Sequence, residues 1–141
     1  MIAAFLVIIS AVSLSGCFQF PEGPFFTMQT KDERLQGNWY IDKVLDPAGN
    51  DVTAQYINYT LFVQVSRDAH NLSFFKDAVL DSYGTYEFAD HGNDIIIVYS
   101  LVNGIDISKE IRQVYYSVRK LTDQSFKYID DNLYEFDWKK K

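Results

Sequence analysis

The feature that most constrains the fold is a succession of short strand-like segments that runs from about Leu35 to the end of the chain. The segments are rich in β-branched and aromatic side chains, which favour strands. Clusters of Asp, Asn, Gly and Pro, the residues of tight turns, separate them. This part of the chain is therefore expected to be all-β, with eight strands over 39–45, 58–66, 72–76, 83–89, 94–102, 111–121, 125–129 and 133–139.

Three local patterns refine this expectation. Asn103-Gly104 is the strongest hairpin signal, because both central positions of a type I′ turn need a positive φ. Residues 52–57 contain no turn former and are predicted to form a short helical turn. Residues 95–98 read Ile-Ile-Ile-Val, which is apolar on both faces and predicts a strand that is covered on both sides.

Eight antiparallel strands joined by short turns fit an up-and-down meander. Closure of such a meander into a barrel removes the exposed strand edges that otherwise invite aggregation. The interior of an eight-stranded barrel has room for side chains or for one small ligand. We therefore predict an eight-stranded antiparallel up-and-down β-barrel, with an open sheet or a sandwich as the alternative.

The first residues of the chain have a different character. Residues 1–16 carry no charge, and the apolar run 2–12 is shorter than the about 20 residues that a membrane-spanning helix needs. A signal-peptide core is the better interpretation, and a buried segment of the domain is the alternative. No Lys or Arg precedes Lys31, whereas signal peptides open with positive residues, so a start upstream of Met1 is expected.

The apolar run is followed by Leu14-Ser15-Gly16-Cys17, which contains the only cysteine of the chain. This sequence resembles the lipobox of bacterial lipoprotein precursors. The resemblance implies cleavage between Gly16 and Cys17, and lipidation of the Cys17 thiol with acyl groups such as palmitate. Lipidation also accounts for a cysteine that has no disulfide partner within the chain.

The lipobox resemblance further implies a place in the cell. Two or more acyl chains hold a protein stably at a membrane, so the protein is expected in the bacterial cell envelope. Phe18 and Gln19 follow the cysteine, in place of the Asp that retains many lipoproteins at the inner membrane of enteric bacteria. The outer membrane is therefore the predicted location.

Three regions follow from these patterns: a signal peptide over 1–16, a lipidated N-terminus and tether over 17–34, and a barrel domain over 35–141. Residues 18–33 contain two prolines, a glycine and no sustained period, as expected of a tether. The same stretch holds four phenylalanines. These either pack on the domain or lie at the membrane interface.

The domain opens with Gly37-Asn38-Trp39, a Gly-x-Trp motif that resembles the first strand of lipocalins and of bacterial lipocalin-like lipoproteins. The resemblance extends over residues 35–141 and includes 118–123 and 134–136. It implies that Trp39 points inward and plugs one end of the barrel. The second and third motifs of true lipocalins are not evident.

Charge and motifs exclude several function classes. The formal net charge of -6 falls entirely on residues after 16, so no basic face for nucleic acid is implied. Hydrolase, zinc-protease and phosphate-binding motifs are absent from the sequence, and neither catalysis nor a cofactor is predicted. His70 and His91, beside Asp68 and Asp90, would offer metal ligands only if their turns met. Solvated turn histidines are the simpler interpretation, and no metal is predicted.

The aromatic residues are the remaining lead to function. On the last strand Tyr134, Phe136 and Trp138 share one face, opposite Leu133, Glu135 and Asp137. With Trp39 they are the candidate ligand-binding residues, and they either fill the core or line a pocket. In residues 111–119, the face with Arg112, Val114, Tyr116 and Val118 is the expected core face.

These observations predict non-catalytic binding of a small apolar ligand inside the barrel. Lys43 or Arg119 could fix an acidic head group if its side chain pointed inward, although a solvated surface position is the simpler interpretation for both. The alternative function is a protein–protein interaction or inhibitor module, which would engage another envelope protein through its outer face or rim.

Overall fold

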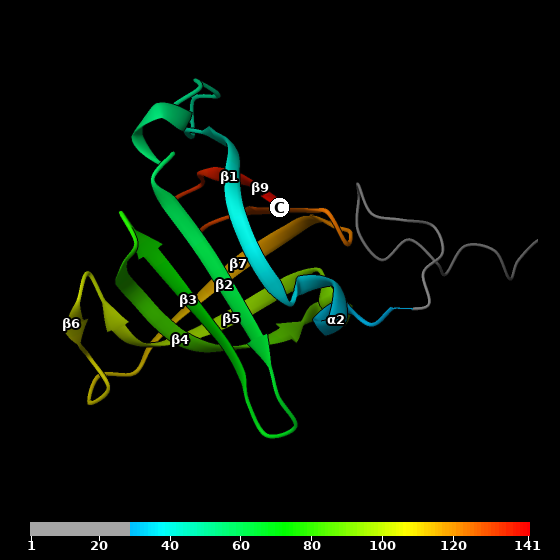
Figure 1. Cartoon of the computed structure of the whole chain (residues 1–141), viewed down its shortest axis with the longest axis vertical. Coiled ribbons are helices and arrows are strands. Elements are labelled where there is room, and N and C mark those ends of the chain that lie inside the picture. Colours follow the sequence, from blue (N-terminus) through cyan, green and yellow to red (C-terminus); the bar gives the residue numbers. More distant parts are fainter. Residues whose placement is uncertain (1–28) are drawn as a thin grey trace, which may run out of the picture.

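A computed structural model of the chain describes residues 29–141, which form a short helix followed by one antiparallel sheet (Figure 1). The helix α2 spans Lys31–Leu35, and the short 3-10 helices η1 and η2 span Thr53–Gln55 and Asp90–Gly92. The strands are β1 Gly37–Leu45, β2 Tyr59–Val65, β3 His70–Lys76, β4 Val79–Ala89, β5 Asp94–Val102, β6 Ile105–Asp106, β7 Arg112–Leu121, β8 Ser125–Ile129 and β9 Glu135–Lys140.

The sheet closes on itself. Its order is β4-β3-β2-β1-β9-β8-β7-β5-β6, and β4 also pairs with β5, which joins the two ends. All of these pairings are antiparallel, and β6 is a two-residue extension on the end of β5. The predicted eight-stranded up-and-down barrel is confirmed, and the open sheet and the sandwich are excluded.

The observed strands lie where the sequence predicts them, with differences at their ends. Asn103 and Gly104 both have positive φ, as the predicted hairpin requires, and η1 is the predicted helical turn. The largest difference is in β4, which begins at Val79 because Asp77 and Ala78, both at positive φ, form a two-residue turn that prolongs the pairing. Ala78 carries no turn signal in the sequence.

One end of the barrel is closed by α2. Figure 1 shows this helix beside the start of β1, whereas the loop with η1 lies beyond the other end of that strand. A capping box starts the helix: the Thr30 hydroxyl accepts from the Glu33 amide, and the Glu33 carboxylate accepts from the Thr30 amide. The helix and the start of β1 together form what we call the closed end.

Trp39 is the plug of the closed end. It is fully buried, and its indole Nε1 donates to the backbone oxygen of Leu35 at 2.7 Å. Gly37 has a φ of +129°, which side chains rarely adopt, and a Cβ there would meet only the flexible end of Lys140. The glycine of the Gly-x-Trp motif is therefore needed for its backbone conformation, and the predicted burial of Trp39 is confirmed.

The helix also brings part of the predicted tether onto the barrel. Arg34 is 2% exposed, and its guanidinium donates to the backbone oxygen of Leu121 at 3.0 Å. Residues 31–34 thus pack on the domain rather than extending away from it. None of the helices within residues 29–141 is long and apolar enough to cross a membrane.

Replacing Arg34 by Ala is expected to lower the free energy of unfolding by about 1–3 kcal/mol, because it leaves the buried Leu121 carbonyl without this donor. Urea denaturation followed by circular dichroism measures the loss. Arg119→Ala, which removes an exposed arginine from β7, is the control. Equal losses in the two variants would contradict the role given to Arg34.

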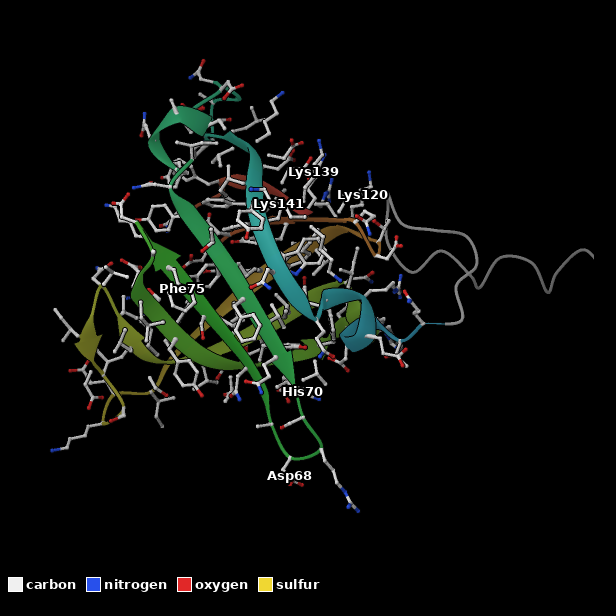
Figure 2. All side chains as sticks on the ribbon, in the orientation of Figure 1. Asp68, His70, Phe75, Lys120, Lys139 and Lys141 are labelled. Carbon is white, nitrogen blue, oxygen red and sulfur yellow. The ribbon has the colours of Figure 1, made fainter. Side chains whose placement is uncertain are left out.

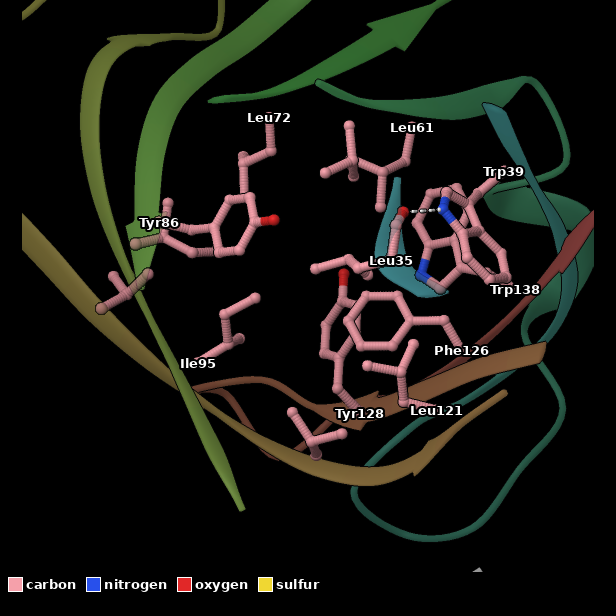
Figure 3. Packing of buried hydrophobic residues seen from close by; sticks show 14 of the residues in the cluster. Leu35, Trp39, Leu61, Leu72, Tyr86, Ile95, Leu121, Phe126, Tyr128 and Trp138 are labelled. Atoms are coloured by element: carbon pink, nitrogen blue, oxygen red, sulfur yellow. Dashed lines mark hydrogen bonds between the residues drawn. The ribbon is translucent and has the colours of Figure 1, made fainter. Parts of the chain in front are cut away.

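The core lies inside the barrel, and the outer face carries no second layer in the part of the chain that the structure describes. Figure 3 shows Leu61, Leu72 and Ile95 pointing into this core. On β5 the alternate residues Ile95 and Ile97 are buried, whereas Val98 is 38% exposed. The prediction that residues 95–98 are covered on both sides is therefore wrong, because a single closed sheet buries only its inner face.

Candidate ligand-binding site

A cavity of about 160 Å³ lies inside the barrel at the end opposite α2, which we call the open end. Apolar cavities of roughly 150 Å³ hold one benzene ring, whereas pockets for drug-sized ligands measure about 300–1,000 Å³. The cavity therefore fits a compact, ring-sized body. Its lining consists of Tyr56, Tyr59, Phe74, Asp81, Ser82, Tyr99, Tyr116, Tyr128, Asp130, Phe136 and Trp138.

Aromatic stacking fixes the walls of the cavity. The rings of Tyr116 and Tyr128 are 4.7 Å apart and nearly parallel, at 4°. Phe136 stacks on Tyr128 at 5.4 Å and meets Tyr56 edge-on, also at 5.4 Å. Such ring pairs contribute about 0.5–1.5 kcal/mol each beyond their buried area. The lining is thus held in place without a ligand.

The tyrosine hydroxyls of the cavity are neutral groups. The hydroxyls of Tyr99 and Tyr116 lie 3.0 Å apart and share a hydrogen bond. Burial raises the pKa of Tyr99 well above its usual value and that of Tyr116 to about 12. Both side chains therefore remain protonated at neutral pH and can donate or accept a hydrogen bond.

Trp138 presents a buried donor that has no acceptor. The side chain is 1% exposed, and its indole Nε1 has no hydrogen-bond partner among the described residues. Figure 3 shows Nε1 on the side of the ring that faces Tyr128. Burial raises the pKa of the Tyr128 hydroxyl and the nearby indole opposes that shift, but the two groups lack hydrogen-bonding geometry. A buried unpaired donor costs roughly 1–3 kcal/mol, which an entering acceptor would recover.

Two carboxylates complete the lining. Asp81 Oδ2 accepts from the Ser82 hydroxyl at 2.8 Å. Asp130 Oδ1 accepts from the backbone amides of Asn132 and Tyr134 at 3.0 and 2.8 Å. Burial raises the pKa of Asp130, and these hydrogen bonds oppose that shift. The charged residues of the lining are thus both acidic.

Comparison with known proteins bears on the fold. No protein-family model matches the sequence, and no significant match occurs among curated proteins. The structure is similar to the crystal structure of a lipocalin-like protein from Bacteroides uniformis, with a TM-score of 0.53 and 14% sequence identity over 77% of this chain and 99% of that one. The fold is lipocalin-like. At this identity the likeness extends to the fold alone.

The lipocalin-like barrel brings only part of the predicted site together. Phe136 and Trp138 line the cavity, on the inner face that alternation predicts. Trp39 lies at the closed end and is not part of the lining. Tyr134 is not part of the lining but packs next to it, with its ring 6.3 Å from that of Tyr56 and 6.5 Å from that of Phe136.

The two candidate basic contacts are surface charges, as the simpler interpretation of the sequence held. Lys43 and Arg119 are both exposed and do not line the cavity. Strict alternation from Trp39 and Ile41 would turn Lys43 inward, but the register of β1 against β9 shifts between Ile41 and Lys43, so Val44 is the buried residue instead. An acidic head group therefore finds no basic partner in the cavity.

Sequence reasoning missed most of the lining. Tyr56, Tyr59, Tyr99 and Tyr128 belong to it, as do Asp81 and Asp130. The alternation of each strand could have placed Tyr59, Tyr99 and Tyr128 on the inner face, whereas Tyr56 lies in the connection between η1 and β2. Alternation gives no information about which end of the barrel stays open, because α2 decides that.

The histidines lie away from the cavity. His70 Nδ1 is 3.7 Å from Asp32, and Figure 2 shows Asp68 at the tip of the hairpin beyond His70. The His91 side chain is 99% exposed and lies 3.8 Å from Asp90. Within residues 29–141, no group of three or more His, Cys, Asp or Glu is arranged to hold a metal ion.

The predicted cleavage and lipidation site lies outside the described residues. Gly16 and Cys17 precede residue 29, where the description begins. The signal peptide, the lipid anchor and the envelope location therefore stay predictions from the sequence.

Proposed function

We propose that this protein is a non-catalytic binding protein of the bacterial envelope, anchored by lipid at Cys17, with a small apolar ligand held inside its lipocalin-like barrel. The observation that carries the binding proposal is the aromatic cavity at the open end. The anchor rests on the Leu-Ser-Gly-Cys sequence after an apolar run, and the outer-membrane location rests on Phe18 and Gln19.

A cavity of this kind supports binding because protein interiors are normally close-packed. The residues next to it, such as Phe126 and Val118, are packed and buried, so the barrel is able to fill its interior elsewhere. At the open end, by contrast, eight aromatic side chains surround the cavity. An apolar enclosure with a few converging polar groups is the usual form of a small-molecule site.

Isothermal titration calorimetry of the full-length protein in phospholipid nanodiscs tests this function, with empty nanodiscs as the blank. The neutral probe 4-ethylphenol is one ring in size, and we expect saturable binding at one site. Phe136→Ala removes a stacked wall residue and is expected to weaken binding about tenfold.

Phe62→Ala is the matched control, because it removes an outward-facing phenylalanine that does not line the cavity. Its affinity for 4-ethylphenol should equal that of the unaltered protein. Absence of saturable binding at millimolar probe, or equal weakening by the two substitutions, would contradict ligand binding in the cavity.

The alternative, a protein-interaction module, is favoured by the rim of the open end. Apolar side chains that are 63–90% exposed occur there on separate connections and strand ends: Ile57, Val79, Ile105, Ile111 and Leu133. A photo-crosslinking residue at position 111, compared with one at position 62, tests it in cells. A discrete protein adduct at 111 alone, together with a cavity that binds no probe, would favour this alternative.

A further inference from the structure

The connections around the open end carry mostly acidic side chains. Residues 46–58, 77–78, 103–111 and 130–134 contain the acidic side chains Asp46, Asp51, Asp77, Asp106, Glu110, Asp130 and Asp131, and the basic side chain Lys109. A cleft surrounded by charges of one sign raises the local concentration of ligands of the opposite sign. The mouth of the cavity therefore attracts cations.

The same preference continues inside the cavity. Asp81 and Asp130 line it, and no Lys or Arg is among the described residues that do so. The other lining groups are mainly aromatic rings, whose faces attract cations within about 6 Å. Carboxylates together with ring faces form an environment in which an ammonium group is stabilised and a carboxylate ligand is repelled.

Two exposed basic side chains near the cavity act in the opposite sense. Lys76 Nζ lies 5.5 Å from the centre of the Tyr59 ring, which is part of the lining, but Lys76 itself is not. Arg112 is near enough to the hydroxyls of Tyr99 and Tyr116 to act on their pKa values. It is exposed and is not part of the lining. The charged groups of the lining itself are thus negative.

The unpaired indole of Trp138 adds a second requirement. Its buried Nε1 needs a hydrogen-bond acceptor, which an ammonium group cannot supply. Trp138 comes from the second half of β9, nearer the closed end, whereas Asp130 follows the last residue of β8, at the open end. The donor is therefore deep in the cavity and the carboxylate lies nearer its mouth.

We propose that the ligand is a small organic amine: a ring-sized apolar body that carries an ammonium group toward Asp81 and Asp130 and a hydrogen-bond acceptor toward Nε1 of Trp138. This inference rests on the proposed ligand-binding function and specifies the chemistry of the ligand. The ammonium group is opposite in charge to the acidic head group that an inward-pointing Lys43 or Arg119 would have bound.

Four probes of similar size separate these requirements in calorimetric titrations of the full-length protein in nanodiscs of zwitterionic phospholipid. Tyramine carries the ring, the ammonium and an oxygen acceptor. In 4-ethylphenol the ammonium is missing, in phenethylamine the acceptor is missing, and 4-hydroxyphenylacetate carries a negative charge instead. We expect tyramine to bind about tenfold more tightly than 4-ethylphenol and phenethylamine, and 4-hydroxyphenylacetate to bind most weakly.

Substitution of the two lining carboxylates tests whether they cause the tighter binding of tyramine. Asp130→Asn and Asp81→Asn each remove one charge but keep an oxygen acceptor for the local hydrogen bonds. Each is expected to weaken tyramine about tenfold and to weaken 4-ethylphenol much less, because that probe has no ammonium group. Asp106→Asn is the matched control, because this carboxylate accepts from the Ser108 amide at the same end without lining the cavity.

The possible results separate this inference from the function on which it rests. Binding of 4-ethylphenol as tight as that of tyramine, or tightest binding of the acid, would overturn the amine but leave ligand binding in place. Equal losses of tyramine affinity in Asp106→Asn and Asp130→Asn would mean that the acidic charge of the whole open end attracts the amine. That result would overturn a direct contact between the ammonium group and Asp130. If none of the four probes binds, the proposed function itself fails.

Discussion

Replacing Trp39 by Ala lowers the free energy of unfolding by about 3–5 kcal/mol, the range for large aromatic deletions in protein cores. The indole is fully buried and stands 5.9 Å from the ring of Phe126, and Lys140 Nζ lies over it at 4.8 Å. The substitution also removes the hydrogen bond that holds the Leu35 carbonyl and α2. Since small domains are stable by about 5–15 kcal/mol, the variant loses much of its stability.

Urea titration followed by far-ultraviolet circular dichroism measures this loss without relying on Trp fluorescence. Asn38→Ala, at the exposed neighbouring position of β1, is expected to change stability by about 0.5 kcal/mol or less. A loss below about 1 kcal/mol for Trp39→Ala would mean that the closed end does not depend on its plug.

We expect the replacement of Cys17 by Ser to leave the protein as unprocessed precursor, because the proposed lipidation requires the thiol and the proposed cleavage follows it. Ser15→Ala changes the variable position of the Leu-x-Gly-Cys motif and should be processed normally. Electrophoretic mobility and partition into detergent report processing and anchoring, and sucrose-gradient fractionation reports the membrane.

Two outcomes would contradict this part of the proposal. If the Cys17→Ser protein is cleaved and still partitions into detergent, the anchor is elsewhere. If the unaltered protein sediments with the inner membrane, Phe18 and Gln19 do not direct it to the outer one.

The barrel could be predicted because its signals are local. Alternating side chains and turn residues identify each strand, and Gly37 and Trp39 mark the first one. The turn at Asp77-Ala78 was missed because its conformation comes from the pairing of the flanking strands. The helix α2 had a visible signal, Thr30 followed three residues later by Glu33, within a stretch that was predicted to be a tether.

The site was harder to predict because it depends on relations between distant elements. Alternation places Phe136 and Trp138 inside, but only the position of α2 shows which end of the barrel is closed around Trp39 and which end holds the cavity. The side of Lys43 depends on a register shift that no local pattern reveals. The Asp130 carboxylate accepts a backbone hydrogen bond within its own turn, as expected of an aspartate there, and it also lines the cavity.

The central claim, that a small ligand enters the aromatic cavity, is tested most directly by nuclear magnetic resonance of the two indole N–H groups. The chain has two tryptophans. Nε1 of Trp39 is already bonded to Leu35, whereas Nε1 of Trp138 is unpaired. Trp138→Phe assigns the two signals. On saturation with tyramine, the Trp138 signal should move downfield while the Trp39 signal stays in place; an unmoved Trp138 signal would contradict binding in the cavity.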